Sequence, residues 1–266
     1  MRVVGILLVR DEDLFVEQAV RNALGFCDEF LAVDNGSQDG TSEILRRMAA
    51  GSGCKFAYHR ADDPGLSHEL IAPLAGTDTW IFAVDGDEIY DPSGLRRFRT
   101  RLESGEFDRD WAVFGNVLNA RRLDLAAGFV AGHLAPPCRS MTKLYNFKAI
   151  EAWEGPCHER LHGGKPRFRR GFHDGMRRNL HETVSWEEAD FRCLHLCFLR
   201  RSSLERENAS PRGNIMDRHA KSWKQRVDDF WRRLRGLSPV DWKEERYGRG
   251  PLVSKPVSEF FPERTA

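Results

Sequence analysis

Hydrophobic runs alternate with amphipathic stretches along the first hundred residues. Four short apolar runs predict strands, at 3–9, 30–33, 55–59 and 80–84. Apolar residues at helical spacing predict helices between and after them, at 13–24, 41–51, 66–74 and 92–102. Strands that alternate with helices in this way form right-handed βαβ units. The pattern therefore predicts an α/β fold with a Rossmann-type, mostly parallel central sheet flanked by helices.

Three details of the pattern refine these elements. The run at 3–9 is apolar throughout, which favours a strand buried on both faces. Pro73 weakens the helix predicted at 66–74, because proline has no N–H to donate. Pro92, in contrast, suits the first turn of the fourth helix.

The second half of the chain is less regular. Further strands are predicted at 111–117, 141–147 and 191–199, and the basic, glycine-containing stretch 160–180 favours loops. A last helix is predicted at 213–235, with an apolar stripe along one side and arginines largely off that stripe. We expect the stripe to pack on the domain or on a second copy in a homodimer. Its aromatic and cationic side chains would also suit peripheral contact with an anionic membrane.

Composition excludes several protein classes. The 266 residues are 41% hydrophobic and 30% charged, with a mean hydropathy of −0.54, as in ordinary globular proteins. No apolar run approaches the roughly 20 residues that cross a bilayer. The first run ends after seven residues, at Arg10, with no small-residue cleavage site, so a buried strand explains it better than a signal peptide. Six scattered cysteines without a C-x-x-C pair indicate a reduced, cytoplasmic protein.

The charge is balanced overall but unevenly distributed. A net charge of +1 indicates no general affinity for nucleic acid. Residues 1–100 contain 10 Lys or Arg and 17 Asp or Glu, a balance of −7, whereas the remainder contains 31 and 23, a balance of +8. Two halves of opposite sign would suit a cation and a polyphosphate held between them, or would simply be solvated surfaces.

Charged side chains follow three of the four predicted parallel strands. Arg10 and Glu12 follow the first strand, Asp34 ends the second, and Asp85-Gly86-Asp87 follows the fourth. Ligands of parallel sheets bind beyond the carboxyl ends of the strands. Two carboxylates so close in sequence can converge on a hard divalent cation such as Mg²⁺ or Mn²⁺. The sequence thus predicts a ligand site at this edge of the sheet.

These motifs together resemble the family 2 glycosyltransferases, which have the GT-A fold and use nucleotide-sugar donors. The resemblance covers about residues 1–105 and rests on three strings, Arg10-Asp11-Glu12, Val33-Asp34-Asn35-Gly36-Ser37-Gln38-Asp39-Gly40-Thr41 and Val84-Asp85-Gly86-Asp87-Glu88. A looser likeness continues through Lys143-Leu144-Tyr145 and Trp153-x-Gly-x-x-His158-Glu159 to His195. It implies a GT-A-like domain over 1–200, with a nucleotide-binding half (1–105) and an acceptor half (106–200). Residues 201–266 would form a C-terminal helical extension.

The resemblance also implies roles for individual residues. Asp34 would contact the nucleotide base, with Arg10 and Glu12 in the same pocket and Arg60 near the base or phosphates. Asp85 would touch the ribose and the metal, and Asp87 would bind the Mn²⁺ or Mg²⁺. The stretch after Arg60 lacks the family's Ala-Arg-Asn-x-Gly, which leaves the nucleotide and the role of Arg60 open.

His195 has three interpretations. The family often supplies a late histidine as a further metal ligand, and we assign His195 this role. A core histidine bonded to backbone is the alternative. A zinc site with Cys193 and Cys197 is a third, although three ligands on one strand leave no obvious fourth.

Residues 158–162 read His-Glu-x-x-His, the zinc-protease signature, which requires a helix. Glycines close on both sides leave barely one turn, so the peptidase is an alternative only. In the glycosyltransferase interpretation Glu159 is the general base, and the pair His181-Glu182 is the weaker candidate. The arginines of 165–178 would close over the diphosphate or remain surface residues.

The sequence therefore predicts a metal-dependent, inverting glycosyltransferase that moves a sugar from a nucleotide-diphosphate donor, UDP-linked by preference, to an acceptor hydroxyl. The acceptor is not defined; saccharides, lipid-linked compounds and natural products all fit. A non-catalytic nucleotide-sugar binding protein is the remaining alternative, besides the zinc metallopeptidase. The predicted location is the cytoplasm, with the inner membrane face as a peripheral site.

Overall fold

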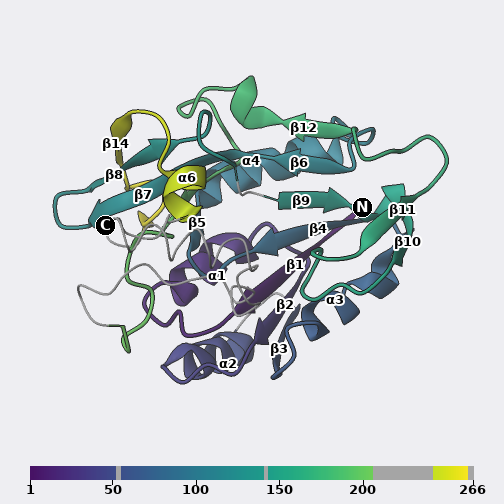
Figure 1. Cartoon of the computed structure of the whole chain (residues 1–266), viewed down its shortest axis with the longest axis horizontal. Helices are drawn as coiled ribbons and strands as arrows, with labels where there is room; N and C mark the ends of the chain where they lie inside the picture. Colours follow the sequence, from purple (N-terminus) through teal and green to yellow (C-terminus); the bar gives the residue numbers. More distant parts are fainter. Residues whose placement is uncertain (52–54, 141–142, 206–241, 263–266) are drawn as a thin grey trace, which may run out of the picture.

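The computed structural model describes residues 1–51, 55–140, 143–205 and 242–262 (Figure 1). Within these residues, a central sheet of seven strands has the order β12-β6-β9-β4-β1-β2-β3. Its strands are β1 (Arg2–Val9), β2 (Glu29–Asp34), β3 (Lys55–Arg60), β4 (Thr79–Val84), β6 (Ala112–Phe114), β9 (Lys143–Asn146) and β12 (Arg177–Asn179).

This central sheet is mostly parallel, as predicted. β1 pairs in parallel with both β2 and β4, and β2 pairs in parallel with β3. β9 is the exception, since it runs antiparallel to both β4 and β6. The four strands predicted in the first hundred residues are all present, which confirms the α/β fold class.

Both faces of the central sheet are buried, and β1 shows why. Val3, Leu7 and Val9 belong to one apolar core, whereas Val4, Ile6 and Leu8 belong to the other. The first core contains residues of α1 (Val16–Leu24), α2 (Thr41–Gly51) and α4 (Pro92–Glu103). The second packs against α3 (Leu66–Glu69), η1 (Ala72–Leu74) and the two-stranded sheet of β10 (Ile150–Glu154) and β11 (Lys165–Phe168). A strand buried on both faces has no polar alternation, as the sequence indicated.

The helices follow the sequence signals with one correction. The single helix predicted at 66–74 is wrong: α3 ends at Glu69, and Pro73 lies in the separate 3₁₀ turn η1. α4 begins at Pro92 as predicted. The carboxylate of Asp91 caps this helix by accepting hydrogen bonds from the N–H groups of Ser93 and Gly94, both at 2.9 Å.

A second sheet lies beside the first and has the order β14-β8-β7-β13-β5 within the described residues. Its strands are β5 (Glu88–Tyr90), β7 (Asn116–Asp124), β8 (Phe129–Leu134), β13 (Arg192–His195) and β14 (Leu252–Pro256). β5 begins four positions after β4 ends, so the turn at 85–87 connects the two sheets. The loops expected at 160–180 are only partly loops, because this stretch contains β11 and β12 and leads into the 3₁₀ turn η3 (Leu180–Glu182). A further 3₁₀ turn, η2 (Phe147–Ala149), follows β9.

The C-terminal segment takes part in this architecture. The described residues after 205 form α6 (Trp242–Tyr247) and β14, and β14 pairs antiparallel with β8. The described part of the expected extension thus adds a strand to the second sheet, besides a short helix. The helix predicted at 213–235 lies outside the described residues. In the described part of the chain, we find no helix with the length and hydrophobicity to span a membrane.

Candidate functional site

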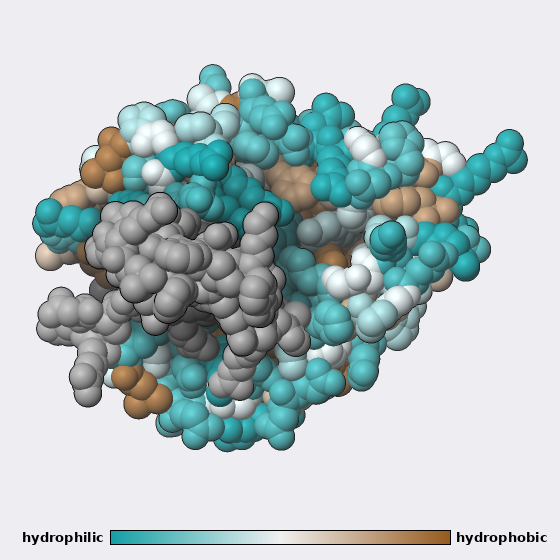
Figure 2. All heavy atoms as spheres, in the orientation of Figure 1, coloured by the Kyte–Doolittle hydropathy of each residue, from teal (hydrophilic) through white to brown (hydrophobic). Residues whose placement is uncertain are grey.

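A cavity of about 650 Å³ opens at the carboxyl ends of β1 and β4. This volume is within the range of small-molecule sites. Figure 2 shows a hollow in this face of the molecule, beside the grey residues, with hydrophilic side chains around it. The lining comes from segments far apart in sequence, among them the turn after β4, β9, the loop at 159–164, β13 and α6.

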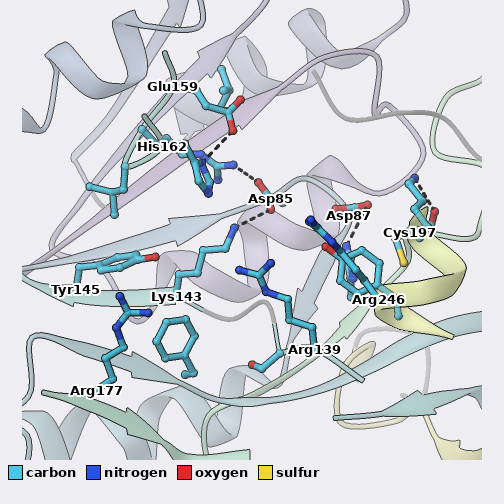
Figure 3. Close-up of a pocket in the computed structure, with 18 of the residues that line it drawn as sticks. Asp85, Asp87, Arg139, Lys143, Tyr145, Glu159, His162, Arg177, Cys197 and Arg246 are labelled. Atoms are coloured by element: carbon cyan, nitrogen blue, oxygen red, sulfur yellow. Dashed lines mark hydrogen bonds and ion pairs between the residues drawn. The ribbon is translucent and has the colours of Figure 1, made fainter. Parts of the chain in front are cut away.

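The turn Asp85-Gly86-Asp87 forms the centre of the cavity, and both carboxylates line it (Figure 3). Gly86 is required there by close packing. A Cβ atom at this position would overlap Oε2 of Glu12 and lie 2.8 Å from Cγ1 of Val9. The glycine therefore lets Glu12, which follows β1, lie directly against the turn that follows β4.

Asp85 is held by two cations. The Arg160 guanidinium lies 2.6 Å from Oδ1, and the Lys143 ammonium lies 3.8 Å from Oδ2. Burial alone would raise the pKa of Asp85, but these two cations hold the pKa well below its ordinary value. Asp85 is therefore ionised throughout the neutral range.

Arg160 reaches Asp85 from an unusual backbone conformation. Its φ of +34° lies in the left-handed region, which costs about 1–3 kcal/mol for a non-glycine residue. α3 fixes this conformation: Oγ of Ser67 accepts a hydrogen bond from the Arg160 N–H at 2.8 Å, and the His68 ring bonds the Arg160 carbonyl. The Arg160 side chain also donates to the carbonyl of Val84 at 3.1 Å. Strain of this kind is concentrated at functional sites.

Asp87 and Glu12 share one buried arginine. Nη1 of Arg201 lies 2.7 Å from Oδ2 of Asp87 and 3.0 Å from Oε1 of Glu12. Burial would raise the pKa of Asp87, but Arg201 and then His195 lower it below its ordinary value. Arg201 thus joins the ends of β1 and β4 through their carboxylates.

His195 lines the cavity from the end of β13, with Nε2 3.8 Å from Oδ2 of Asp87. Its Nδ1 lies 2.7 Å from Oδ1 of Asn119, an acceptor, so Nδ1 carries the proton. Burial lowers the pKa of His195, although Asp87 acts in the opposite direction. The ring is therefore neutral at pH 7, and its Nε2 presents a lone pair on the side of Asp87.

Asp87 and His195 fit the ligand types of a divalent cation. A neutral imidazole oriented by a second residue is the usual state of a metal-binding histidine. No group of three or more His, Cys, Asp or Glu side chains is arranged for a metal ion in the part of the chain that the structure describes. That finding also gives no support to a Cys193–His195–Cys197 zinc site. A cation held by two protein ligands is compatible with Mg²⁺, which takes its other ligands from water and substrate phosphates.

Glu159 also lines the cavity, but the peptidase interpretation of its motif is wrong. Residues 158–162 form a tight turn, in which the His158 N–H donates to the His162 carbonyl at 2.9 Å. Without a helix, the two histidines do not share the face that a zinc protease requires. Oε1 of Glu159 instead lies 3.1 Å from Nδ1 of His162. Burial would raise the pKa of Glu159, but His162 and Arg160 lower it, which keeps the carboxylate ionised.

Five of the eight site residues predicted from sequence line this one cavity: Glu12, Asp85, Asp87, Glu159 and His195. Glu182, the weaker candidate for the base, is exposed and is not among the lining residues. Arg10, Asp34 and Arg60 do not line the cavity either. They lie at the same edge of the sheet, because Val9 pairs with Asp34 and Asp34 pairs with Arg60 in the strand register.

Asp34 is fully buried and organises its own turn. It accepts hydrogen bonds from the Ser37 N–H at 2.8 Å and the Tyr58 hydroxyl at 3.0 Å, and another from Ser42. Burial would raise the pKa of Asp34, but these hydrogen bonds lower it. Arg60 lies 3.7 Å away and donates to Ser42 at 2.6 Å.

Sequence reasoning missed most of the cations in the cavity. Among the residues that the structure describes, seven Lys or Arg side chains line it: Arg139, Lys143, Arg160, Arg177, Arg201, Lys243 and Arg246. All seven come from the basic second part of the chain, whereas three of the five lining carboxylates come from the acidic first part. The uneven charge distribution was the available signal, but it does not single out individual residues.

No family model matches the chain, and no curated protein matches it. Solved structures with some likeness include TarS from S. aureus in complex with UDP, with 15% identity over 55% of this chain and 47% of that chain, at a TM-score of 0.38. Glucosyl-3-phosphoglycerate synthase from Mycobacterium tuberculosis matches with 16% identity over 59% and 61%, at a TM-score of 0.35. A UDP-glucose pyrophosphorylase complexed with UDP-glucose matches with 12% identity over 55% and 76%, at 0.33. The matched region is thus about half of the TarS structure, and likenesses this weak do not assign an activity to this chain.

Proposed function

We propose that this protein is a GT-A-like glycosyltransferase that transfers a sugar from a nucleotide-diphosphate donor, preferably a UDP-sugar, to an acceptor hydroxyl. One observation carries the proposal. At the carboxyl edge of a parallel sheet, the carboxylates of Asp85, Asp87 and Glu159 line one small-molecule cavity together with the neutral ring of His195. This is the arrangement that the resemblance to family 2 glycosyltransferases implies.

In the proposed reaction, Glu159 is the general base of a single, inverting displacement. Its ionised carboxylate accepts the proton of the acceptor hydroxyl as that oxygen attacks the anomeric carbon. The bond from the anomeric carbon to the diphosphate oxygen breaks, and the nucleoside diphosphate leaves with the electron pair. His162 orients the Glu159 carboxylate through the 3.1 Å contact.

Asp87 and His195 would hold Mn²⁺ or Mg²⁺, with Asp85 beside them. A bound divalent cation supplies neutralisation of the charge that develops on the departing diphosphate. Arg201 contacts Asp87 at 2.7 Å, so it would share this carboxylate with the cation. Arg160 keeps Asp85 ionised and in place. At the ends of β1, β2 and β3, Arg10, Asp34 and Arg60 remain proposed nucleotide-binding residues.

The test is nucleotide binding and donor turnover in Asp87→Asn. A thermal-shift screen of UDP, GDP, dTDP and CDP with and without Mn²⁺ first identifies the nucleotide, since a ligand of the native state raises its melting temperature. Hydrolysis of the corresponding nucleotide-sugar is then measured. We expect Asp87→Asn to lower turnover roughly 100-fold or more, the usual cost of removing a group that stabilises developing charge. Asp108→Asn, an exposed carboxylate outside the cavity, is the matched control.

Two outcomes would contradict the proposal. Near-normal turnover in Asp87→Asn would remove this carboxylate from the chemistry. Saturable binding of a nucleotide-sugar without any turnover, by the wild-type protein supplied with Mn²⁺ or Mg²⁺, would instead indicate a non-catalytic binding protein.

A further inference from the structure

A second set of cations lines the cavity on the side of β9, β12 and α6. They are Arg139 just before β9, Lys143 in β9, Arg177 in β12 and Arg246 in α6, and we call these four residues the cationic wall. In Figure 3, Arg139, Lys143 and Arg177 lie on the opposite side of the cavity from Glu159, with Asp85 between them. Three regions of the chain therefore bring positive charge to one side of a small-molecule site.

Arg139 is the clearest member of the wall. Its guanidinium is exposed and forms no hydrogen bond or ion pair with any residue that the structure describes. Its backbone is nevertheless fixed, because the Arg139 N–H donates to the Arg246 carbonyl at 3.0 Å. The next residue, Ser140, is buried and donates to the Gly115 carbonyl at 2.8 Å. The Arg139 guanidinium is thus held at the cavity with no ion-pair partner among the described residues.

Arg177 is positioned beside an aromatic surface. Its Nε donates to the Asp174 carbonyl at 2.9 Å, and its guanidinium lies 5.2 Å from the centre of the Trp111 ring. The Trp111 ring packs in turn on Tyr145, at 5.5 Å between centroids. Trp111 and Tyr145 both line the cavity, so the wall combines cations with an apolar surface for the carbon skeleton of a ligand.

Seven cationic and five carboxylate side chains of the described residues line the cavity, so positive charge is in excess there. Four of the five lining carboxylates that the structure describes lie at the strand ends and the 159–164 loop: Glu12, Asp85, Asp87 and Glu159. Arg160 and Arg201 already pair with those at the strand ends. Among the described residues, Lys143 of the wall lies 3.8 Å from Asp85 and Arg177 contacts Asp174, whereas Arg139 has no carboxylate partner. The wall is therefore suited to an anion, since guanidinium groups match phosphate and carboxylate oxygens.

The order of the strands separates this wall from the proposed donor site. β9, β6 and β12 lie on one side of β4, whereas β1, β2 and β3, which carry the proposed nucleotide-binding residues, lie on the other. A nucleotide along the ends of β1–β3 would place its diphosphate near Asp85 and Asp87, and the wall would face the transferred sugar from the far side. We infer that the wall binds the acceptor, and that the acceptor is a hydroxyl compound carrying a phosphate or carboxylate group. This inference rests on the proposed glycosyl transfer.

The test compares three acceptor-like sugars, one neutral, one carrying a phosphate and one carrying a carboxylate. Glucose, glucose 6-phosphate and glucuronate are titrated by calorimetry into the wild-type protein, with and without saturating UDP and Mn²⁺. We expect at least one anionic probe to bind about tenfold or more tightly than glucose, the effect of one charge-assisted hydrogen bond. Arg139→Ala and Arg177→Ala should remove this preference. Arg122→Ala is the matched control, because its side chain is 67% exposed and does not line the cavity.

The UDP affinity of each variant decides what the wall binds. The loss of affinity for the anionic probe in Arg139→Ala should exceed the loss for UDP at least tenfold. Equal losses would assign the wall to the donor diphosphate and overturn the inference, as would equal binding of glucose and both anions. If wild-type protein binds none of UDP, GDP, dTDP and CDP and hydrolyses no corresponding nucleotide-sugar, the proposed function fails. If such a protein still prefers the anionic probes and loses this preference in Arg139→Ala, the wall would be an anion-binding site unrelated to glycosyl transfer.

Discussion

Asp85 and Asp87 in the turn after β4 differ in protonation from Glu88, the first residue of β5. Arg160 and Lys143 lower the pKa of Asp85, and Arg201 and His195 lower that of Asp87, in each case against burial. Glu88 is the opposite case: burial, followed by the neighbouring charge of Asp85, raises its pKa to about 8. Its Oε2 accepts a hydrogen bond from the Tyr90 hydroxyl at 2.9 Å, while Oε1 is buried with no hydrogen-bond partner among the described residues. Glu88 is therefore protonated at pH 7.

This protonation makes stability depend on pH. An unfolded chain releases the Glu88 proton near pH 4.5, whereas the folded chain retains it up to about pH 8. The contribution of Glu88 is thus most favourable below pH 4.5 and is lost as the pH rises towards 8. We expect Glu88→Gln to raise the free energy of unfolding by roughly 4 kcal/mol at pH 8 and to have little effect at pH 4. Urea unfolding at both pH values measures this, and an equal effect at both would contradict it.

The sequence predicts the place of a side chain in the fold where that place follows from the local pattern of apolar and polar residues. Asp85 and Asp87 were predicted because they directly follow an apolar strand, and strand ends of a parallel sheet meet at one edge. Their partners could not be predicted in this way. Arg201 contacts Asp87 across 114 positions of the chain, and neither its spacing nor its neighbours in sequence indicate this contact.

At the scale of elements, Asp91 connects the start of α4 to β13. One carboxylate oxygen caps α4, and the other lies 3.0 Å from Nη2 of Arg192 on β13. Both side chains are at least 96% buried. Arg192 also lies over the Trp186 ring, at 5.6 Å from the ring centre to the guanidinium carbon. The same residue thus starts a helix and neutralises a charge in the core of the second sheet.

Two substitutions separate these roles. Asp91→Asn keeps an oxygen acceptor for the cap but removes the charge, whereas Asp91→Ala removes both. We expect Asp91→Ala to lower the free energy of unfolding by about 2–4 kcal/mol, because the helix loses its cap and Arg192 loses one of two carboxylate partners, with Glu259 remaining 2.8 Å from its Nη2. Asp91→Asn should lower the free energy of unfolding by about 1 kcal/mol less than Asp91→Ala does, because the asparagine still caps the helix. Chemical denaturation of both variants checks this, and an Asp91→Ala protein within 1 kcal/mol of wild type would be the contrary result.

The elements themselves were predictable in the first half because each is long and apolar. β1–β4 have six to eight residues each, and their apolar runs are evident in the sequence. β6 and β12 have only three residues, too few for any period to appear. β12 even carries Arg177 and Arg178, so its pairing with β6 depends on tertiary contacts that the local sequence does not specify.

At the scale of the whole molecule, residues 242–262 complete both a sheet and the cavity. β14 pairs with β8, and Lys243, Arg246 and Tyr247 of α6 line the cavity. Phe260 is fully buried and stacks on Trp186 at 5.7 Å between ring centroids. Its carbonyl accepts a hydrogen bond from the Asn22 side chain of α1 at 2.8 Å. The last segment is thus packed against the first helix of the chain.

Removing this segment should therefore destabilise the rest of the protein. We expect a protein that ends at residue 241 to lose cooperative thermal unfolding, because the loss of the C-terminal segment exposes the apolar core around Trp186 to water. The milder change Phe260→Ala, which leaves α6 and β14 in place, should lower the free energy of unfolding by about 3–5 kcal/mol. Scanning calorimetry distinguishes the variants. A truncated protein with the wild-type melting temperature would show that the segment is dispensable for folding.

The short connection between the two sheets has a consequence for ligand binding. Because β4 and β5 flank the Asp85–Asp87 turn on both sides and each is hydrogen-bonded into a different sheet, the turn has little freedom to rearrange. Such preorganisation means that the conformational entropy of the acidic pair is lost during folding, before any ligand arrives. Selectivity among ligands then depends mainly on how well each one matches a rigid template.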